Sequence, residues 1–293
     1  SIMAVELWPY LLCGVLAYRC SKERRKKGCM SWLGRKKASK GPAAAAVQQP
    51  AAAEGPAAGE PGADGEVREA EPLADQTLFG VLADAGFKAA VRSSDSAIED
   101  VDMPAFLEAA ARYREALSVM GTAVKLVLGD FEKNYNYVKS VVEADLTGRR
   151  TLRVFLQAEL DANIHSTSPC QLHDPSGACM LQWLLRGLEF FFTMLRLMVD
   201  GDRSAASNAY VQTLQQYHGW VTSLGMKAAL TAMPSREGLC SLGALCPAVQ
   251  GEPARLSAAI LRDAARAVDA MLPMVQWMIA GFRERQLWES RQV

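Results

Sequence analysis

The chain has 293 residues, in which 32 Lys and Arg balance 32 Asp and Glu, so the formal net charge is zero. Half of the residues are hydrophobic, which excludes a collagen-like chain and a chain that is disordered throughout. The charges are sorted along the sequence: the net charge is +8 over residues 1–40, −6 over residues 41–75 and −2 over residues 76–293. A nearly neutral body without a basic stripe argues against nucleic acid as a partner, because nucleic-acid binding needs many phosphate contacts.

Residues 2–18 are apolar except for Glu6 and contain Pro9 near their middle. As a helix they span about 25 Å, slightly less than the roughly 30 Å hydrocarbon core of a bilayer. The basic cluster of residues 19–40 follows this run, whereas a secretory signal peptide carries its charges before the apolar segment. We therefore interpret the apolar run 2–18 as a helix that spans a membrane or is embedded in one leaflet. With Ser1 it forms the predicted anchor segment, residues 1–18. Residues 19–40 are then a basic juxtamembrane flank that keeps the rest of the chain cytosolic.

Three cysteines lie in or beside this segment, either as ordinary thiols or as palmitoylation sites that add a second membrane signal: Cys13, Cys20 and Cys29. The other four form no CxxC pair and are expected to be free thiols in a cytosolic body. His165, Cys170 and His173 lie close together, but their spacing matches no common zinc site and favours a polar loop. We expect no metal and no cofactor.

Residues 41–75 consist mainly of Ala, Pro, Gly and Glu, with almost no large apolar side chain. Such a segment cannot bury enough surface to offset the entropy lost on ordering. It is predicted to be a disordered linker with a root-mean-square reach of roughly 30–35 Å. It would tether a domain formed by residues 76–293 to the membrane.

From residue 76 onward the pattern is helical. Apolar residues recur at spacings of three, four and seven, as on the buried face of a helix: Phe106, Tyr113, Leu117, Met120, Val124 and Leu128. No stretch alternates convincingly with a period of two. We predict an all-α domain with helices near residues 77–92, 103–128, 130–145, 150–164, 178–200, 204–218, 220–232, 236–246 and 254–285.

The most apolar stretch of this domain is Met180–Val199, which is interrupted by Arg186, Glu189 and Arg196. Three charges inside the stretch exclude a membrane span. It is therefore predicted to be a central helix of the globular core.

Three polar segments stand out within the helical body. Asp130 and Asn134 are four residues apart on one helix face, where a carboxylate and an amide together can hold vicinal hydroxyls. Trp183 is either a core residue or an indole that stacks on the C–H face of a sugar ring. His218 is followed by Trp220, whose amphipathic ring suits a membrane surface. Taken singly, Asp130 and Asn134 are better explained as a solvated polar pair and His218 as a structural imidazole, and Trp183 can be a core residue.

Taken together, the three segments resemble a known family. The D-x-x-x-N motif at Asp130–Asn134, the WLLRGL run at Trp183–Leu188 and the YHGW run at Tyr217–Trp220 match glycolipid transfer proteins in order and spacing. This superfamily includes the ceramide-1-phosphate transfer proteins, and the resemblance covers roughly residues 100–250. It implies an all-helical two-layer sandwich that encloses a lipid, with a polar recognition site at its surface.

The resemblance also implies roles for individual residues. Asp130 and Asn134 would hydrogen-bond the lipid head group, and Asp130 would also accept the ceramide amide N–H. Trp183 would be the stacking platform, and His218 would donate to the amide carbonyl of the acyl chain. Trp220 would lie at the membrane-docking face. From periodicity, we expect the lipid chains to lie in a sleeve lined by residues such as Phe190, Phe191, Leu195 and Val211.

The sequence departs from both branches of the family at positions that decide head-group chemistry. The glycolipid branch has Lys where this chain has Tyr137, and the nearby Lys139 does not sit at the matching position. The ceramide-1-phosphate branch has cationic residues at the positions of Trp183 and Cys179, so a phosphate-binding fork is absent. Tyr137, Lys139 and Cys179 are therefore accessory candidates. The contact residues favour a neutral sugar head group, although the flanking sequence is nearer to the phosphate branch.

The leading hypothesis is a monomeric, non-enzymatic protein that transfers or senses a sphingolipid, with a glycosylceramide and a membrane surface as partners. Ceramide-1-phosphate transfer is one alternative. A second alternative is a membrane-tethered adaptor that uses the same fold for protein interaction, which the Tyr137 substitution favours. A hydrolase built on His218 and Asp130 ranks last, because no Ser or Cys lies in a nucleophile motif.

Overall fold

The computed structural model describes residues 75–121 and 124–292. The predicted anchor, the basic flank and all but the last residue of the predicted linker lie outside the described residues. Within the described part the fold is predominantly helical, which confirms the predicted fold class. Two short antiparallel hairpins that the sequence did not indicate are added to the helices.

The structure places the helices and strands as follows. The α-helices are α3 (Leu78–Ala89), α4 (Met103–Ser118), α5 (Lys125–Ala144), α6 (Leu152–Asp161), α7 (Gly177–Val199), α8 (Ala205–Gln212), α9 (Trp220–Leu230), α10 (Arg236–Cys240) and α11 (Pro253–Glu284). The 3-10 helices are η2 (Gln215–Tyr217), η3 (Gly243–Leu245) and η4 (Pro247–Val249). Strand β1 (Ala90–Arg92) pairs with β2 (Ile98–Val101), and β3 (Ser166–Thr167) pairs with β4 (Cys170–Gln171).

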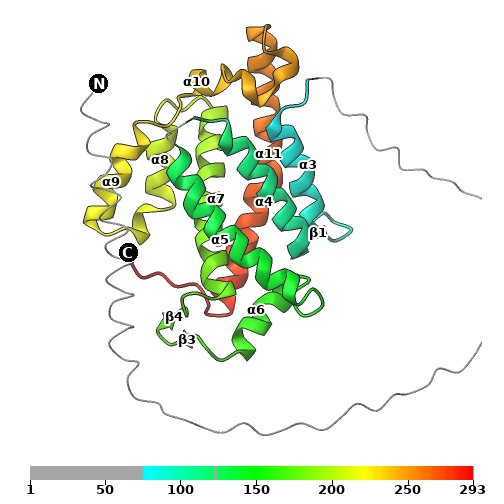
Figure 1. Cartoon of the computed structure of the whole chain (residues 1–293), viewed down its shortest axis with the longest axis vertical. Helices are drawn as coiled ribbons and strands as arrows, with labels where there is room; N and C mark the ends of the chain where they lie inside the picture. Colours follow the sequence, from blue (N-terminus) through cyan, green and yellow to red (C-terminus); the bar gives the residue numbers. More distant parts are fainter. Residues whose placement is uncertain (1–74, 122–123, 293) are drawn as a thin grey trace, which may run out of the picture. The chain divides into compact units, whose positions relative to one another are not determined.

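Helix α7 is the central element of the domain (Figure 1). It packs against α5, α8 and α11, while α3 packs against α4 and α11. Among the described residues, α7 is the one helix long and apolar enough to cross a membrane, and 78% of its most apolar stretch is buried inside the domain. The prediction of a core helix at this position is therefore confirmed.

The predicted helix 103–128 is wrong at its C-terminal end. Helix α4 ends at Ser118, and Gly121 has φ of 96°, a left-handed conformation that glycine adopts without strain. The chain turns there, and α5 begins at Lys125, five residues before the predicted start at residue 130. The predicted helix 77–92 likewise stops at Ala89, and its last three residues form β1.

Two further predicted helices are shorter than expected. The helix predicted at 204–218 ends at Gln212, where the hydroxyl of Thr213 donates to the carbonyl oxygen of Ala209 at 2.7 Å. This side-chain bond competes with the helical hydrogen-bond pattern. The helix predicted at 236–246 ends at Cys240 and is followed by η3.

The chain reverses direction after α11 through a Schellman motif. The amide of Leu287 donates to the carbonyl of Phe282 at 2.9 Å, and the amide of Gln286 donates to that of Arg283 at 3.0 Å. Gln286 takes the left-handed conformation, with φ of 56°, that this motif requires. The reversal directs Leu287 and Trp288 back onto the domain, where Leu287 is fully buried.

A buried carboxylate fixes the start of α3. Asp263 of α11 is fully buried and accepts hydrogen bonds from the amide of Thr77 at 2.9 Å and from Nε of Arg262 at 2.8 Å. Burial alone would raise the pKa of Asp263, but these hydrogen bonds outweigh burial and hold it below its usual value. The close approach of the two helices depends on Gly80, because a Cβ there would lie 2.6 Å from Oδ2 of Asp263.

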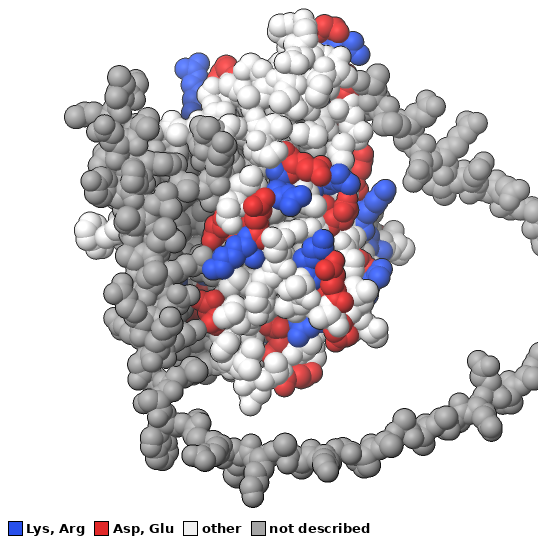
Figure 2. All heavy atoms as spheres, in the orientation of Figure 1, with Lys and Arg blue, Asp and Glu red and all other residues white. Residues whose placement is uncertain are grey.

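Figure 2 shows basic and acidic side chains intermingled on the face in view. Arg112 and Glu108 form an ion pair at 2.6 Å, with both side chains partly open to solvent. Exposed pairs of this kind contribute little to stability. On that face, therefore, charges of both signs alternate, and they form no single-sign stripe.

We expect Gly80→Ala to lower the free energy of unfolding by about 1–3 kcal/mol, because the added methyl group forces α3 away from Asp263. Gly129→Ala in α5 is the matched control, since a Cβ at Gly129 meets nothing within 4 Å. The control should gain about 0.5–1 kcal/mol from helix propensity. Urea unfolding monitored by circular dichroism measures both variants. Equal stability of the two would contradict the assigned close contact.

Candidate functional site

The D-x-x-x-N motif lies on α5, as the sequence predicts. Nδ2 of Asn134 donates to Oδ2 of Asp130 at 3.2 Å. Asp130 lies at the surface, whereas Asn134 is only 1% exposed. The pair therefore joins an exposed carboxylate to an amide that is buried in the domain.

The amide of Asn134 has an acceptor without a donor. Its Oδ1 is buried and has no hydrogen-bond partner in the structure. Rotating the amide by 180° would place Oδ1 against the carboxylate of Asp130, so the bond between the two residues fixes the orientation. A buried acceptor of this kind is costly unless a donor reaches it.

Arg186 is the buried centre of the second segment. It is 2% exposed, and its guanidinium carbon lies 3.8 Å from the ring centroid of Tyr217, 4.9 Å from that of Trp183 and 5.3 Å from that of Trp288. Cation–π attraction of this kind strengthens when the cation is desolvated. Burial lowers the pKa of Arg186, so the three rings and their surroundings must offset the loss of hydration.

The C-terminal tail, residues 286–292, completes this arrangement. The carbonyl oxygen of Glu289 accepts from Nη2 of Arg186 and, at 3.3 Å, from Nε2 of Gln182. The amide of Glu289 donates to Oε1 of Gln182 at 2.7 Å. Nε1 of Trp288 donates to the hydroxyl of Tyr217 at 3.0 Å. Residues of α7 thus bind the tail backbone on one side, and the tail holds Tyr217 on the other.

His218 follows Tyr217 and lies between η2 and α9. Its Nδ1 is 3.2 Å from the hydroxyl of Tyr210 on α8, and the two ring centroids are 5.6 Å apart. Burial, together with the positive charge of Arg186, lowers the pKa of His218 to about 4. The imidazole is therefore neutral at neutral pH, with one nitrogen that donates and one that accepts.

An exposed apolar face covers α8 and α9, which pack against each other (Figure 1). Trp220 is 81% exposed, and Val221 and Leu224 follow it on α9 with similarly open side chains. Val211 of α8 is 61% exposed, so the expectation that it lines an interior sleeve is wrong. The period of the sequence did not reveal which side of α8 faces the core.

The other residues expected to line the sleeve are buried in the core: Phe190, Phe191 and Leu195. Phe191 packs edge-on against Tyr113 of α4, with centroids 4.9 Å apart, and Tyr113 packs against Phe131 of α5 at 5.0 Å. Aromatic rings from α4, α5 and α7 therefore meet beneath the α5 pair.

The three accessory candidates differ in their surroundings. Tyr137 is half-buried and packs against the core. Lys139 is exposed and pairs with Glu143 at 3.7 Å. Cys179 is buried in the first turn of α7, where its amide donates to the hydroxyl of Ser176 at 3.0 Å. The exposed cation at Lys139 is thus already engaged by a carboxylate on its own helix.

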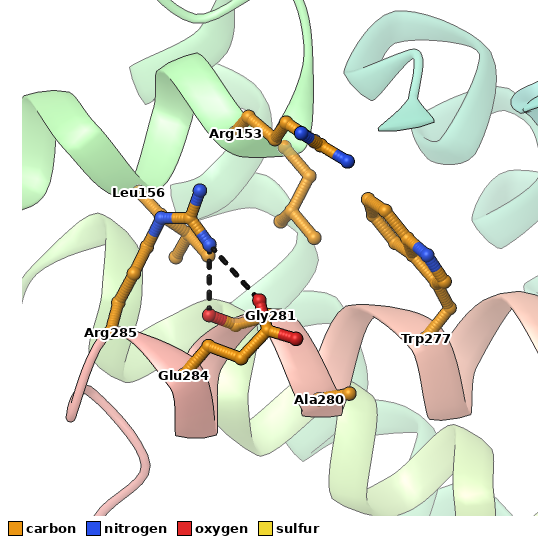
Figure 3. A pocket seen from close by; sticks show the side chains of 8 residues that line it. Arg153, Leu156, Trp277, Ala280, Gly281, Glu284 and Arg285 are labelled. Carbon is orange, nitrogen blue, oxygen red and sulfur yellow. Dashed lines mark hydrogen bonds and ion pairs between the residues drawn. The ribbon is translucent and has the colours of Figure 1, made fainter. Parts of the chain in front are cut away.

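A cavity of about 160 Å³ lies between α6 and α11, away from the elements that carry these residues (Figure 3). Two arginines line it. Arg153 lies 5.8 Å from the ring centroid of Trp277 and 4.0 Å from Asp100, and Arg285 donates to the carbonyl oxygen of Gly281 at 3.3 Å. Both cations are therefore occupied by groups of the domain itself.

The polar loop between α6 and α7 is tied together internally. Nε2 of His165 lies 3.3 Å from the buried carboxylate of Glu159, and Nδ1 of His165 accepts from the amide of His173 at 3.1 Å. Both ring nitrogens of His165 thus have partners, one on α6 and one in the loop. Among the described residues, no group of three His, Cys, Asp or Glu side chains is placed to hold a metal ion.

Trp183 lies against Arg186, whose charge also acts on His218, and Asp130 is bonded directly to Asn134 on the neighbouring helix α5. Sequence reasoning missed the roles of Arg186, Tyr210 and Trp288. Arg186 drew notice there only as a charge inside an apolar helix. An arginine at such a position does indicate a buried cation that requires partners, but the partners lie too far away in sequence to be identified.

The described residues form a predominantly helical domain with polar groups beside a large apolar core. The family model for glycolipid transfer protein (GLTP) matches residues 101–243. The chain belongs to the glycolipid transfer protein family. This is a family of glycolipid and sphingolipid transfer proteins.

Relatives and solved structures agree with this assignment. Glycolipid transfer protein of Danio rerio is 31% identical over 149 residues, covering 47% of this chain and 68% of that protein. Glycolipid transfer protein A of Xenopus laevis is 29% identical over 154 residues, covering 47% of this chain and 69% of that protein.

Two solved structures share the fold. The GLTP-fold structure of FAPP2, described as selecting simple glycosphingolipids, has a TM-score of 0.62 at 24% identity and covers 74% of this chain and 100% of its own. Human ceramide-1-phosphate transfer protein in complex with ceramide-1-phosphate has a TM-score of 0.59 at 15% identity, covering 72% and 98%. At these identities the likeness establishes the fold alone.

The lowered pKa of His218 predicts a pH dependence of stability. Between pH 6.5 and about 4 the unfolded chain binds a proton at His218 that the folded chain does not. Acidification therefore favours unfolding. The stability that depends on a neutral His218 is fully present above pH 6.5 and is lost as the pH falls toward 4. We expect His218→Gln to flatten the fall in unfolding free energy across this range, as measured by urea titration at several pH values.

The matched control is His173→Gln, which removes an exposed imidazole. If His218→Gln and the wild type lose stability in parallel between pH 6.5 and 4, the burial of His218 described above is wrong.

Proposed function

We propose that this domain binds a glycosylceramide and transfers it between membranes. The observation that carries the proposal is the buried, unpartnered Oδ1 of Asn134 beside the carboxylate of Asp130. An acceptor requires a donor, and sugar hydroxyls donate, whereas a phosphate at neutral pH is almost entirely an acceptor. A sugar head group therefore satisfies Asn134, and a phosphate does not.

The cations near the site support the same choice. Cys179 is a buried thiol, and Trp183 is aromatic, at the two positions where the phosphate branch of the family is cationic. Arg186 is a cation of the same helix, but it is 2% exposed and already bonded to the tail. Lys139 is paired with Glu143. A doubly charged phosphate would lose its hydration without gaining a bidentate partner.

The ceramide amide is matched by the remaining groups. Asp130 accepts the amide N–H, and His218, neutral at physiological pH, donates to the acyl carbonyl. The half-buried indole of Trp183 is the platform for the sugar ring. Tyr137 takes the place of the family's lysine and offers a hydroxyl in its stead.

The lipid chains enter the core at a place that is closed by contacts between aromatic side chains and not by helix backbone. Phe190, Phe191 and Leu195 line this sleeve, and the edge-on contact between Tyr113 and Phe191 separates to admit a chain. Exchanging ring contacts for contacts with acyl methylene groups keeps the apolar area out of water, so the opening costs little hydrophobic energy.

The apolar face of α8 and α9 docks on the membrane through Trp220, Val221 and Leu224. The predicted anchor, flank and linker in residues 1–75 would confine this domain to within the linker's reach of one membrane. Transfer at a membrane contact site, or sensing on the anchoring membrane, follows from such a tether.

We expect Asn134→Ala to abolish glycosylceramide transfer between vesicles while lowering the unfolding midpoint only slightly, because loss of the hydrogen bond to Asp130 is offset by removal of a buried acceptor that has no protein partner. Asp130→Val should abolish transfer with the helical circular dichroism spectrum intact. Asn136→Ala is the matched control: it removes an exposed amide two residues away on the same helix, and transfer should persist. A fluorescence assay with labelled glucosylceramide in donor vesicles measures all three.

Two outcomes contradict the proposal. Equal transfer of ceramide-1-phosphate and glucosylceramide by the wild type would remove the head-group argument. Native mass spectrometry that finds no stoichiometric sphingolipid on the purified chain, together with no transfer, would favour the adaptor.

We expect Trp220→Ala to weaken adsorption to phosphatidylcholine vesicles by roughly tenfold or more, because an exposed indole loses its burial in the interface. Phe87→Ala on α3 is the matched control, since it removes an aromatic ring that is 43% exposed on a different helix. Vesicle co-sedimentation measures both. Comparable losses in the two variants would show that exposed aromatics act non-specifically.

A further inference from the structure

Two polar side chains, Tyr210 and Ser223, contact His218 and each other. The hydroxyl of Tyr210, on α8, lies 3.2 Å from Nδ1 of His218 and 3.1 Å from Oγ of Ser223, on α9. Ser223 also lies 3.3 Å from the carbonyl oxygen of His218. Tyr210 is 1% exposed, so its hydroxyl has no access to bulk water. Its single proton therefore has to be shared among these neighbours.

Two arrangements of protons are open to this cluster, and they differ at Nε2 of His218. In the first, Ser223 donates to Tyr210 and Tyr210 donates to Nδ1, so the imidazole proton sits on Nε2; this arrangement reverses the bond that Tyr210 donates to Ser223 in the structure and gives up the bond from Ser223 to the carbonyl oxygen of His218. In the second, Nδ1 donates to Tyr210, Tyr210 donates to Ser223, and Ser223 donates to the carbonyl of His218. Nε2 is then an acceptor.

The chemistry of the ligand decides between the two arrangements. An acyl carbonyl has no proton to give, so it can be bound only by an imidazole that carries its proton on Nε2. Protonating both nitrogens would also provide a donor, but Arg186 and burial oppose a second positive charge at this position. The direction in which the Tyr210 hydroxyl points therefore controls whether His218 donates or accepts.

We propose that Tyr210 is a positioning residue that donates to Nδ1 of His218, with its hydroxyl oriented by Ser223, and so keeps the imidazole proton on Nε2 for the amide carbonyl of the bound sphingolipid. This assignment rests on the function proposed above and deepens it. Tyr210 does not touch the lipid; it acts through His218.

Tyr210→Phe is a sharp probe of this assignment, because it removes one oxygen and keeps the buried ring. The phenylalanine packs against the same neighbours, so the fold is retained, and circular dichroism with thermal melting checks this. Ser223→Ala removes the other end of the relay. Ser207→Ala, an exposed serine on α8, is the matched control.

The first readout is spectroscopic. The full chain is loaded with a short-acyl glucosylceramide, and the imidazole ¹⁵N and ¹³C shifts of His218 are recorded. In the wild type and in Ser207→Ala we expect the proton on Nε2. In Tyr210→Phe we expect a mixture of tautomers, and in Ser223→Ala a smaller change in the same direction. A proton found on Nδ1 in the loaded wild type overturns the proposal.

The second readout is affinity. Tyr210→Phe should bind the short-acyl glucosylceramide about tenfold more weakly, as expected for the loss of one hydrogen bond at a buried site. Its affinity for glucosylsphingosine, which has no acyl carbonyl, should equal that of the wild type. Equal weakening toward both lipids means a merely structural role for Tyr210 and overturns the assignment.

The two failures are distinguishable. If the wild type binds no glycosylceramide, the proposed function itself fails. If the wild type binds it and Tyr210→Phe changes neither the tautomer nor the affinity, the function stands and the relay is wrong.

Discussion

The site depends on the burial of one cation. Arg186 sits among Tyr217, Trp183 and Trp288, and it binds the backbone carbonyl of Glu289. An unpaired buried guanidinium would be costly, so each of these partners is required by the others. Because the partners come from α7, from η2 and from the C-terminal tail, compensating this single charge fixes three distant parts of the chain around the proposed amide-binding residue. Burial lowers the pKa of His218, and the charge of Arg186 lowers it further, so the imidazole is neutral.

Much of the fold was predictable because burial follows local periodicity. Helix α7 begins and ends one residue before its predicted bounds, since Ser176 caps a long apolar run. The break between α4 and α5 was not predictable in the same way. Met120 and Val124 lie outside both helices and are still buried, so the apolar period continues across a turn that Gly121 makes. Periodicity reports which residues are buried, and tertiary packing can bury a turn as well as a helix.

In the site, too, contacts between residues close in sequence were predictable, whereas contacts between distant residues were not. The contact between Asp130 and Asn134 was foreseeable because four residues bring two side chains together on any helix. The contacts of Arg186 were not, since Glu289 is 103 residues away and no local pattern marks it. Resemblance to a family identified the polar residues, but only the structure reveals that Asn134 has an unused acceptor. That acceptor, rather than any charge, is what argues for a sugar.

Helix α9 carries both an exposed membrane-docking residue and a residue of the hydrogen-bonded cluster at His218. It carries the exposed Trp220, and one turn later it supplies Ser223, which contacts Tyr210 beneath His218. Leu230 is its one buried residue, so α9 is held mainly by its neighbour α8 and moves at little cost to the core. A shift of α9 on contact with a membrane would change the partner of the Tyr210 hydroxyl before it disturbed any helix of the core. Membrane contact and the grip on the ceramide amide would then be coupled through a single serine, so that docking itself would loosen the lipid.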